Sequence, residues 1–151
     1  SLRAEGLVMA WKKLGLLVAA AVLLASPALA QLKRGYGKPL SEAETKAALL
    51  GIQMKGYSPT YGFSWRECIQ PNGETLYESP DAVLKGRLTI APGGQACFAY
   101  EDDQYSSMAC FAAYKTESGV RFETEGPSPV VFVTTKIVRG VKSCEPHDLI
   151  G

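Results

Sequence analysis

An aromatic group near residue 60 has the residue types best suited to binding a ligand. Tyr57, Tyr61, Phe63 and Trp65 lie close together, and the last three alternate along the chain. Alternation places them on one face of a strand, where rings can stack on a sugar or line an apolar pocket. In the alternative interpretation, Phe63 and Trp65 only fill the interior of a small barrel. The candidate ligand-binding residues are therefore Tyr57 and Tyr61, expected in a loop at the barrel mouth, together with Trp65.

Residues suited to catalysis are sparse. The single histidine, His147, lies near the end of the chain, and acyl transfer would need a nucleophile and an orienting group beside it. Carboxylate pairs for glycoside hydrolysis can be drawn from Glu67, Glu74 and Glu78, but any strand-rich domain offers such pairs, and solvated strand faces are the default interpretation. We expect no catalytic residue and a protein that is not an enzyme.

Signals for metals and cofactors are also absent from the sequence. The acidic run 101–103 lacks the alternating oxygen ligands and the glycine of a calcium loop. No glycine-rich phosphate loop precedes a helix, and no two cysteines have the C-x-x-C spacing of a zinc site. We expect neither a metal nor a cofactor.

A leader precedes the elements that position these residues. Lys12 and Lys13 form a basic segment, an apolar core follows at 14–25, and Ala28 and Ala30 are small. This pattern predicts a secretory signal peptide cleaved after Ala30. A membrane-spanning helix would need about 20 apolar residues, which is more than this core provides.

The leader divides the chain into two parts. We assign residues 1–30 to an upstream extension and the signal peptide, and residues 31–151 to a single exported β domain, periplasmic or secreted. Losing three of the 16 basic residues and one of the 15 acidic residues leaves the domain with a net charge of −1. A nucleic-acid partner would need a basic surplus, so none is expected. After signal cleavage we expect no membrane association either.

Four cysteines lie in the exported part: Cys68, Cys97, Cys110 and Cys144. An even number in an exported chain predicts two disulfides, with three possible connectivities. Two Ala-Cys-Phe phrases flank a polar loop, and the hairpin that aligns them places Cys97 opposite Cys110. We therefore predict the pairs Cys97–Cys110 and Cys68–Cys144. The rival pattern is Cys68–Cys97 with Cys110–Cys144.

A short helix is predicted at the start of the exported domain. Ser41 and Glu44 have the spacing of a capping box, and Gly51 fits the C-terminal cap. The apolar residues at helical spacing are Ala43, Ala47 and Leu50. This stripe is expected to pack on a sheet.

Strand patterns fill the rest of the domain. After an expected loop at 56–62, the segments that predict strands are 63–70, 75–78, 86–91, 95–100, 109–114, 120–124 and 130–139. Along the first of them, Phe63, Trp65, Glu67 and Ile69 alternate onto one face. The links are too short for parallel crossovers. The sequence therefore predicts a mainly β fold, an antiparallel meander of about seven strands that forms a small barrel or strongly curved sheet, with the helix packed on it. The alternative is a two-sheet β-sandwich.

The motifs Trp-x-x-Cys, Pro-Asn-Gly, Gly-Arg-Leu-Thr-Ile and the two Cys-Phe pairs lie between Gly62 and Phe122. Their spacing resembles that of small secreted, disulfide-bonded β proteins of Gram-negative bacteria, an uncharacterised group. The resemblance implies export and β architecture, and it brings no catalytic residues.

Two functions of different classes are consistent with these features. In the first, the domain binds a small molecule or a glycan at the mouth of the barrel. In the second, it is an inhibitor or interaction protein whose loops, such as 101–107, contact another exported protein, for example a hydrolase. An interior cavity would favour the first, and a packed core with a protruding rigid loop the second.

Overall fold

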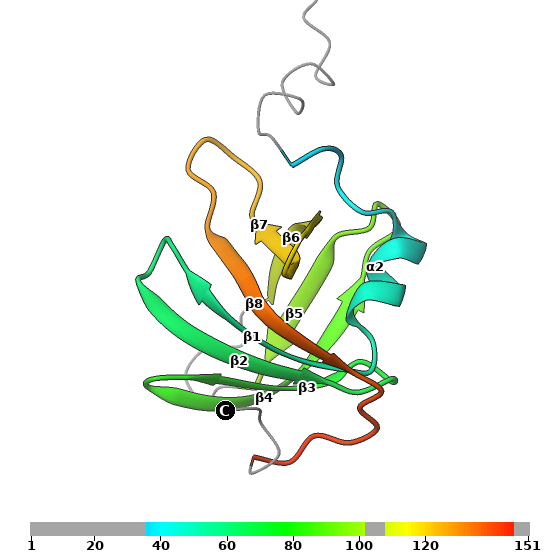
Figure 1. Cartoon of the computed structure of the whole chain (residues 1–151), viewed down its shortest axis with the longest axis vertical. Coiled ribbons are helices and arrows are strands. Elements are labelled where there is room, and N and C mark those ends of the chain that lie inside the picture. The colour runs from blue at the N-terminus through cyan, green and yellow to red at the C-terminus, as the bar shows by residue number, and fades with distance from the viewer. Residues whose placement is uncertain (1–35, 102–107, 147–151) are drawn as a thin grey trace, which may run out of the picture.

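The structure is a computed structural model that describes residues 36–101 and 108–146. These residues form one helix and eight strands: α2 (Glu42–Leu49), β1 (Ile52–Ser58), β2 (Phe63–Ile69), β3 (Glu74–Ser79), β4 (Ala82–Ile90), β5 (Ala96–Tyr100), β6 (Met108–Thr116), β7 (Gly119–Glu123) and β8 (Val131–Arg139). Each strand pairs antiparallel with the next, and β8 pairs with β1. The sheet is therefore a closed up-and-down barrel (Figure 1).

The predicted antiparallel barrel is confirmed, and the sandwich alternative is wrong. The strand count was one too low because residues 56–58, which we expected in a loop, belong to β1. Gly56 pairs with Trp65 across β1 and β2, and a Cβ atom there would lie 2.5 Å from Cζ2 of Trp65. The indole occupies the space that a side chain at residue 56 would need. Gly56 therefore allows Trp65 to approach the backbone of the neighbouring strand closely, and it does not mark a turn.

Helix α2 begins as its capping box predicts. The Ser41 amide donates to Oε2 of Glu44 over 2.8 Å, and the Glu44 amide donates to Oγ of Ser41 over 3.3 Å. Gly51 follows the C-cap residue with φ of 72°, a value at which glycine is favoured. Among the described residues, no helix has the length and apolar character required to cross a membrane.

The helix buries a different face from the one predicted, although Leu50 of the predicted stripe, at the C-cap, is partly buried against the core. Thr45 and Leu49 are buried, whereas Ala43 and Ala47 are exposed. The hydroxyl of Thr45 donates to the carbonyl of Gly94 in the β4–β5 turn over 2.8 Å. That hydrogen bond satisfies a polar side chain inside the contact, and it fixes the helix face in a way that apolar spacing cannot reveal.

Helix α2 lies at the end of the barrel where the β4–β5 turn is found (Figure 1). Leu49 projects from the helix into a cluster of fully or nearly fully buried aliphatic side chains on the strands. These are Ile52, Ile69, Leu88 and Ala96. Burying such side chains is the main stabilising contribution in a domain of this size, at about 1.5–3 kcal/mol each. This end of the barrel is therefore closed by a packed core.

Both predicted disulfides are confirmed. Cys97 and Cys110 are directly opposed in the β5–β6 hairpin with Cα atoms 4.0 Å apart, and we call their bond the hairpin disulfide. Cys68 and Cys144 are bonded with Cα atoms 5.7 Å apart, and we call this bond the tail disulfide because it fastens the C-terminal segment to β2. Two such bonds indicate an oxidising compartment, outside the cytoplasm.

Candidate ligand-binding cavity

The barrel holds a cavity of about 280 Å³ in the half that lies away from the aliphatic core. Its lining is almost entirely apolar or aromatic: Met54, Tyr61, Trp65, Glu67, Tyr77, Phe98, Tyr100, Ala109, Phe111, Phe122, Thr124, Val130 and Phe132. Glu67 at the inner part is 4% exposed, whereas Tyr61 is 58% exposed and Ala109 is also exposed. The cavity therefore runs from the buried interior to the surface.

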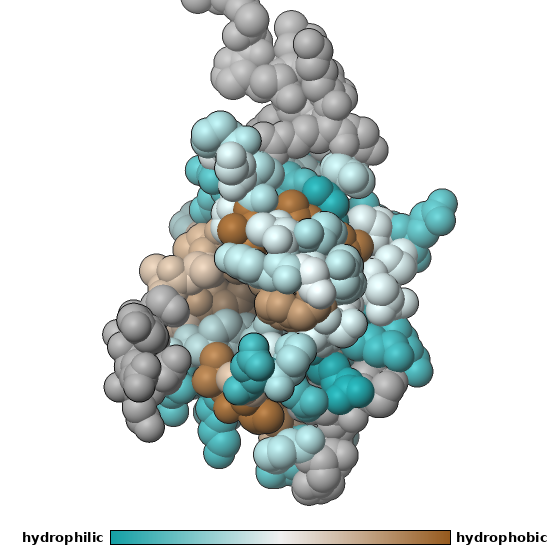
Figure 2. Space-filling view, turned by 90° about the vertical axis from the view of Figure 1, so that its left-hand side faces the viewer, coloured by the Kyte–Doolittle hydropathy of each residue, from teal (hydrophilic) through white to brown (hydrophobic). Residues whose placement is uncertain are grey.

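Figure 2 shows the side of the molecule on which the β1–β2 and β3–β4 turns lie, where apolar surface alternates with pale and hydrophilic residues. Two large apolar side chains, Val83 and Met108, are exposed but do not line the cavity. At the cavity mouth itself, the ring of Tyr61 is exposed. A mouth of this kind suits a ligand that leaves water for an apolar interior.

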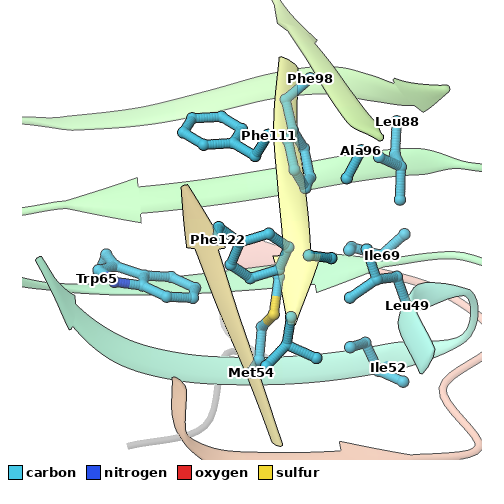
Figure 3. Close-up of a cluster of buried hydrophobic side chains, with 12 residues drawn as sticks. Leu49, Ile52, Met54, Trp65, Ile69, Leu88, Ala96, Phe98, Phe111 and Phe122 are labelled. Carbon is cyan, nitrogen blue, oxygen red and sulfur yellow. The ribbon is translucent and has the colours of Figure 1, made fainter. Parts of the chain in front are cut away.

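Aromatic rings form the wall of the cavity. Trp65 meets Phe122 and Phe132 edge to face, with ring centroids 6.5 and 6.0 Å apart. Phe98 and Phe111 continue the same cluster at 6.2 Å. Figure 3 shows the rings of Trp65, Phe98, Phe111 and Phe122 on one side, with Leu49, Ile69 and Leu88 on the other. The interior thus has an aliphatic half that is packed and an aromatic half that is hollow.

Two glycines allow aromatic side chains to lie flat against the barrel wall. Gly56 faces Trp65, and Gly86 pairs with Tyr100 across β4 and β5. A Cβ atom at Gly86 would lie 2.7 Å from Cδ1 of Tyr100. In both pairs the ring takes the place of a neighbouring side chain. The rings are therefore held back toward the wall, and the lumen between them stays open.

Glu67 is a carboxylic acid inside this aromatic half. Its Oε1 accepts a hydrogen bond from the Tyr100 hydroxyl over 2.7 Å. Burial raises the pKa of Glu67 to about 8, because the charged form loses its hydration. The Tyr100 hydrogen bond opposes this effect, and the neighbouring Thr75 hydroxyl opposes it more weakly, since it makes no close hydrogen bond. At neutral pH the side chain is therefore mostly protonated.

The pKa values of two tyrosines beside Glu67 are also raised. Burial, reinforced by the nearby Glu67, raises the pKa of Tyr77 to about 12. Burial and the same carboxyl also raise the pKa of Tyr100 well above its usual value. Their hydroxyls remain protonated over the physiological range, so they serve as hydrogen-bond donors and not as bases.

The predicted ligand-binding residues are separated by the structure. Tyr61 stands at the cavity mouth and stacks on Phe63 with centroids 5.8 Å apart, and Trp65 lines the wall at 3% exposure. Tyr57 belongs to β1 and not to a loop; it follows the inward-facing Gly56, so it lies on the outer face of the strand and does not line the cavity. Two of the three residues thus come together.

The sequence did not single out Glu67 or its tyrosine partners as a site. Glu67 was considered only as one member of a carboxylate pair with Glu74 or Glu78. Those two form ion pairs instead, with Arg87 at 3.6 Å and Arg66 at 3.0 Å. A signal was present, however, in the row Phe63, Trp65, Glu67 and Ile69, where one acid interrupts an apolar face.

The remaining chemical candidates lie outside the described residues or do not line this cavity. His147 and Asp102–Asp103 lie outside the described residues, and Glu101 does not line the cavity. Within the described ranges, no three His, Cys, Asp or Glu side chains are grouped as metal ligands. A second hollow, of about 640 Å³, lies beside the C-terminal segment and has charged groups of both signs, including Glu74, Lys85 and Arg87. Glu74 and Arg87 form an ion pair there at 3.6 Å.

Comparisons with known proteins identified no relative of this chain. No protein-family model, no curated protein and no solved structure matches it significantly. The class that the fold and cavity define is therefore a small disulfide-bonded, up-and-down β-barrel with an aromatic interior cavity.

Proposed function

We propose that this chain is an exported binding domain that holds one small, predominantly apolar molecule inside its barrel and does not transform it. The observation that carries the proposal is the 280 Å³ aromatic cavity, which is open at one end and closed at the other. Up-and-down barrels of eight strands have an interior wide enough either to fill with side chains or to hold one small ligand. Here part of the lumen is unfilled.

The character of the lining supports an apolar molecule over a glycan. A sugar offers many hydroxyls and is bound tightly only where many polar groups converge on it. Among the described lining residues the polar groups are Glu67, Thr124, the hydroxyls of tyrosines and the unpartnered indole N–H of Trp65. Aromatic faces and edges make up most of the remaining surface, and these favour a compact apolar or aromatic group.

Export supports the same proposal. The two disulfides fit an oxidising compartment, and the predicted signal peptide ending at Ala30 would deliver the chain to the periplasm or the exterior. A carrier that acts there would meet its ligand outside the cytoplasm. The alternative, an inhibitor or interaction protein acting on another exported protein, would use loops such as 101–107, most of which lies outside the described residues.

The proposal is tested by blocking the cavity. Ala109→Phe places a ring in the mouth, because Ala109 lines the cavity and is exposed. Ala99→Phe is the matched control, since Ala99 lies on the adjacent strand, is exposed and does not line the cavity. Native mass spectrometry of each exported protein, purified from its own cell envelope, reports the bound mass.

We expect a small organic molecule on the wild-type protein and on Ala99→Phe, and none on Ala109→Phe. A stoichiometric protein partner in place of a small molecule, retained by Ala109→Phe, would favour the inhibitor hypothesis and refute this one. Trp65 gives a second readout, because the leader residue Trp11 is the other tryptophan of the chain and is lost on cleavage. Ligand entry should therefore change the fluorescence of the processed protein.

A further inference from the structure

The described residues partner the carboxyl of Glu67 only incompletely. It accepts one close hydrogen bond, from Tyr100 at 2.7 Å; the buried Thr75 hydroxyl lies nearby without a close partner, and the described residues provide no ion pair. None of the described residues that line the cavity is a lysine, arginine or histidine. A carboxylate can accept several hydrogen bonds, so this buried group retains unused acceptor capacity beside an open space.

An incompletely partnered buried acid discriminates between classes of ligand. An anionic ligand would find no compensating cation, and its charge would hold the carboxyl in the protonated form. A hydrocarbon would leave the carboxyl as it is. An ammonium group would supply both the missing charge and the missing donors, in surroundings where the attraction is stronger than in water.

We propose, building on the proposed binding function, that the ligand is a small amine with a compact apolar or aromatic tail, bound as its ammonium ion with the nitrogen against Glu67 and the tail among the rings. The observation that carries this is the position of one acid at the inner part of an otherwise apolar, aromatic cavity.

The aromatic rings next to Glu67 reinforce the choice of a cation. Tyr77 and Tyr100 have ring centroids 5.3 Å apart, and Phe98 stacks on Tyr100 at 6.1 Å with ring planes 7° apart. All three rings line the cavity beside the acid. Aromatic faces attract cations within about 6 Å, and more strongly where water is excluded. Both the acid and the rings therefore favour a positive charge.

The size of the cavity limits the ligand. An engineered protein cavity of roughly 150 Å³ binds benzene, and the cavity here, at about 280 Å³, is about twice that volume. One aromatic ring with a two- or three-atom chain that ends in nitrogen fits this space. A long acyl chain or a fused polycyclic ligand exceeds it.

Binding of the ammonium ion is coupled to release of a proton. The titratable groups that face Glu67 are Tyr77 and Tyr100, both of which stay neutral, so the acid is mostly protonated at pH 7 in the empty barrel. When the ammonium ion enters, the carboxyl gives its proton to solvent and the site becomes a neutral ion pair. Affinity for the amine should therefore rise about tenfold per pH unit up to about pH 8 and then level off.

The experiment uses three probes of similar size and shape: phenethylamine, 2-phenylethanol and 3-phenylpropionate. Their affinities for the exported, processed protein are measured by Trp65 fluorescence and by calorimetry between pH 6 and pH 8.5. Calorimetry in two buffers of different ionisation enthalpy counts the protons released. We expect the amine to bind at least about tenfold more tightly than the alcohol at pH 8, the acid to bind least, and about one proton to be released per amine at pH 7.

Two variants connect this selectivity to the acid. Glu67→Gln keeps the shape and removes the charge, so it should lower amine affinity to the level of the alcohol while leaving alcohol binding nearly unchanged. Glu78→Gln is the matched control, because Glu78 pairs with Arg66 and does not line the cavity. It should retain the selectivity of the wild type.

The outcomes separate this inference from the function on which it rests. Binding of the alcohol as tightly as the amine, with no proton release, overturns the inference and leaves the binding function standing. Amine selectivity that survives Glu67→Gln also overturns it. If no probe binds, or if Ala109→Phe binds all three as the wild type does, the cavity is not a binding site and both proposals fail. If Glu67→Gln does not fold, the probe series and the proton count on the wild type still decide.

Discussion

Glu67→Gln should remove much of the pH dependence of folding stability between pH 5 and pH 8. In the unfolded chain this carboxyl has its ordinary pKa of 4.5, and in the folded barrel burial raises the pKa to about 8. The folded state thus holds a proton that the unfolded state releases. The stability contributed by this group is fully present below about pH 4.5 and is lost progressively as the pH rises toward 8.

The magnitude follows from the size of the shift. Each pH unit between the two pKa values changes the free energy of unfolding by about 1.4 kcal/mol. From pH 5 to pH 7 the wild-type protein should therefore lose on the order of 3 kcal/mol through Glu67 alone. Because total stabilities are typically 5–15 kcal/mol, this loss is large enough to dominate the pH profile. Glutamine has nearly the same shape and does not titrate, so the variant should lack this component.

The assay is urea-induced unfolding of the oxidised, processed protein at half-unit steps from pH 5 to pH 8. The difference in unfolding free energy between wild type and Glu67→Gln isolates the acid, since the other carboxyl groups are common to both. Glu78→Gln, whose side chain is partly exposed and ion-paired, should follow the wild-type profile. A wild-type-minus-variant difference that stays constant across this range would refute the reasoning, because it would show that Glu67 has the same pKa folded and unfolded.

Three further predictions concern the backbone, the disulfides and the leader. Gly56→Ala should lower the free energy of unfolding by about 1–3 kcal/mol and shift Trp65 emission, because its Cβ would meet the Val133 carbonyl oxygen and the indole ring. Gly93→Ala is the control, since open space surrounds Gly93, and it should change stability by less than about 0.5 kcal/mol. Serine replacement of the tail disulfide, which spans 76 residues, should lower the unfolding free energy measured in urea by up to about 4.5 kcal/mol. For the hairpin disulfide, which spans 13, the loss should be up to about 3 kcal/mol. The reverse order would contradict the chain-entropy argument. N-terminal sequencing of the exported protein should begin at Gln31, and a chain that retains 16–25 would show that the leader is not cleaved.

Features with a local period could be predicted from the sequence alone. Alternation along 63–69 placed Trp65 and Glu67 on one face, and both line the cavity from the same side of β2. The two Ala-Cys-Phe phrases fixed a register in which Cys97 faces Cys110, as the strand pairing confirms. Side chains along a strand alternate with a period of two residues, so a single correct anchor orients every side chain of a strand.

Features that depend on a remote partner could not be predicted in this way. Gly56 signals a turn when considered with its sequence neighbours, and its strand role follows only once Trp65 is known to lie across from it. Thr45 is likewise polar in isolation, and its burial depends on the carbonyl of Gly94, 49 residues away. In each case the deciding contact is brought about by barrel closure, which local propensity does not contain.

The cavity and its acid could not be predicted from the sequence for a related reason. A cavity is a difference between the volume that a barrel encloses and the volume that its side chains fill, and neither can be computed before the strands are paired. The pKa of Glu67 depends on enclosure by rings from several strands and on Tyr100, 33 residues away. A composition with many aromatic residues is equally compatible with a solid core, which is why the two interpretations of Phe63 and Trp65 could not be separated.

The cavity and the acid lower stability together, and this shared cost favours a functional explanation for both. Replacing Glu67 by an apolar residue would remove the pH-dependent loss worked out above, and larger residues at Gly56 and Gly86 would need the space that the rings now use. A barrel shaped only for stability would fill its lumen with aliphatic side chains, as this chain does around Leu49. Instead, one half of the interior contains the cavity, the aromatic rings that lie against the barrel wall and the incompletely partnered carboxyl of Glu67. Local departures from stable packing that coincide in one place are expected at functional sites, and a bound ammonium ion would offset all three by filling the space, contacting the rings and pairing the acid.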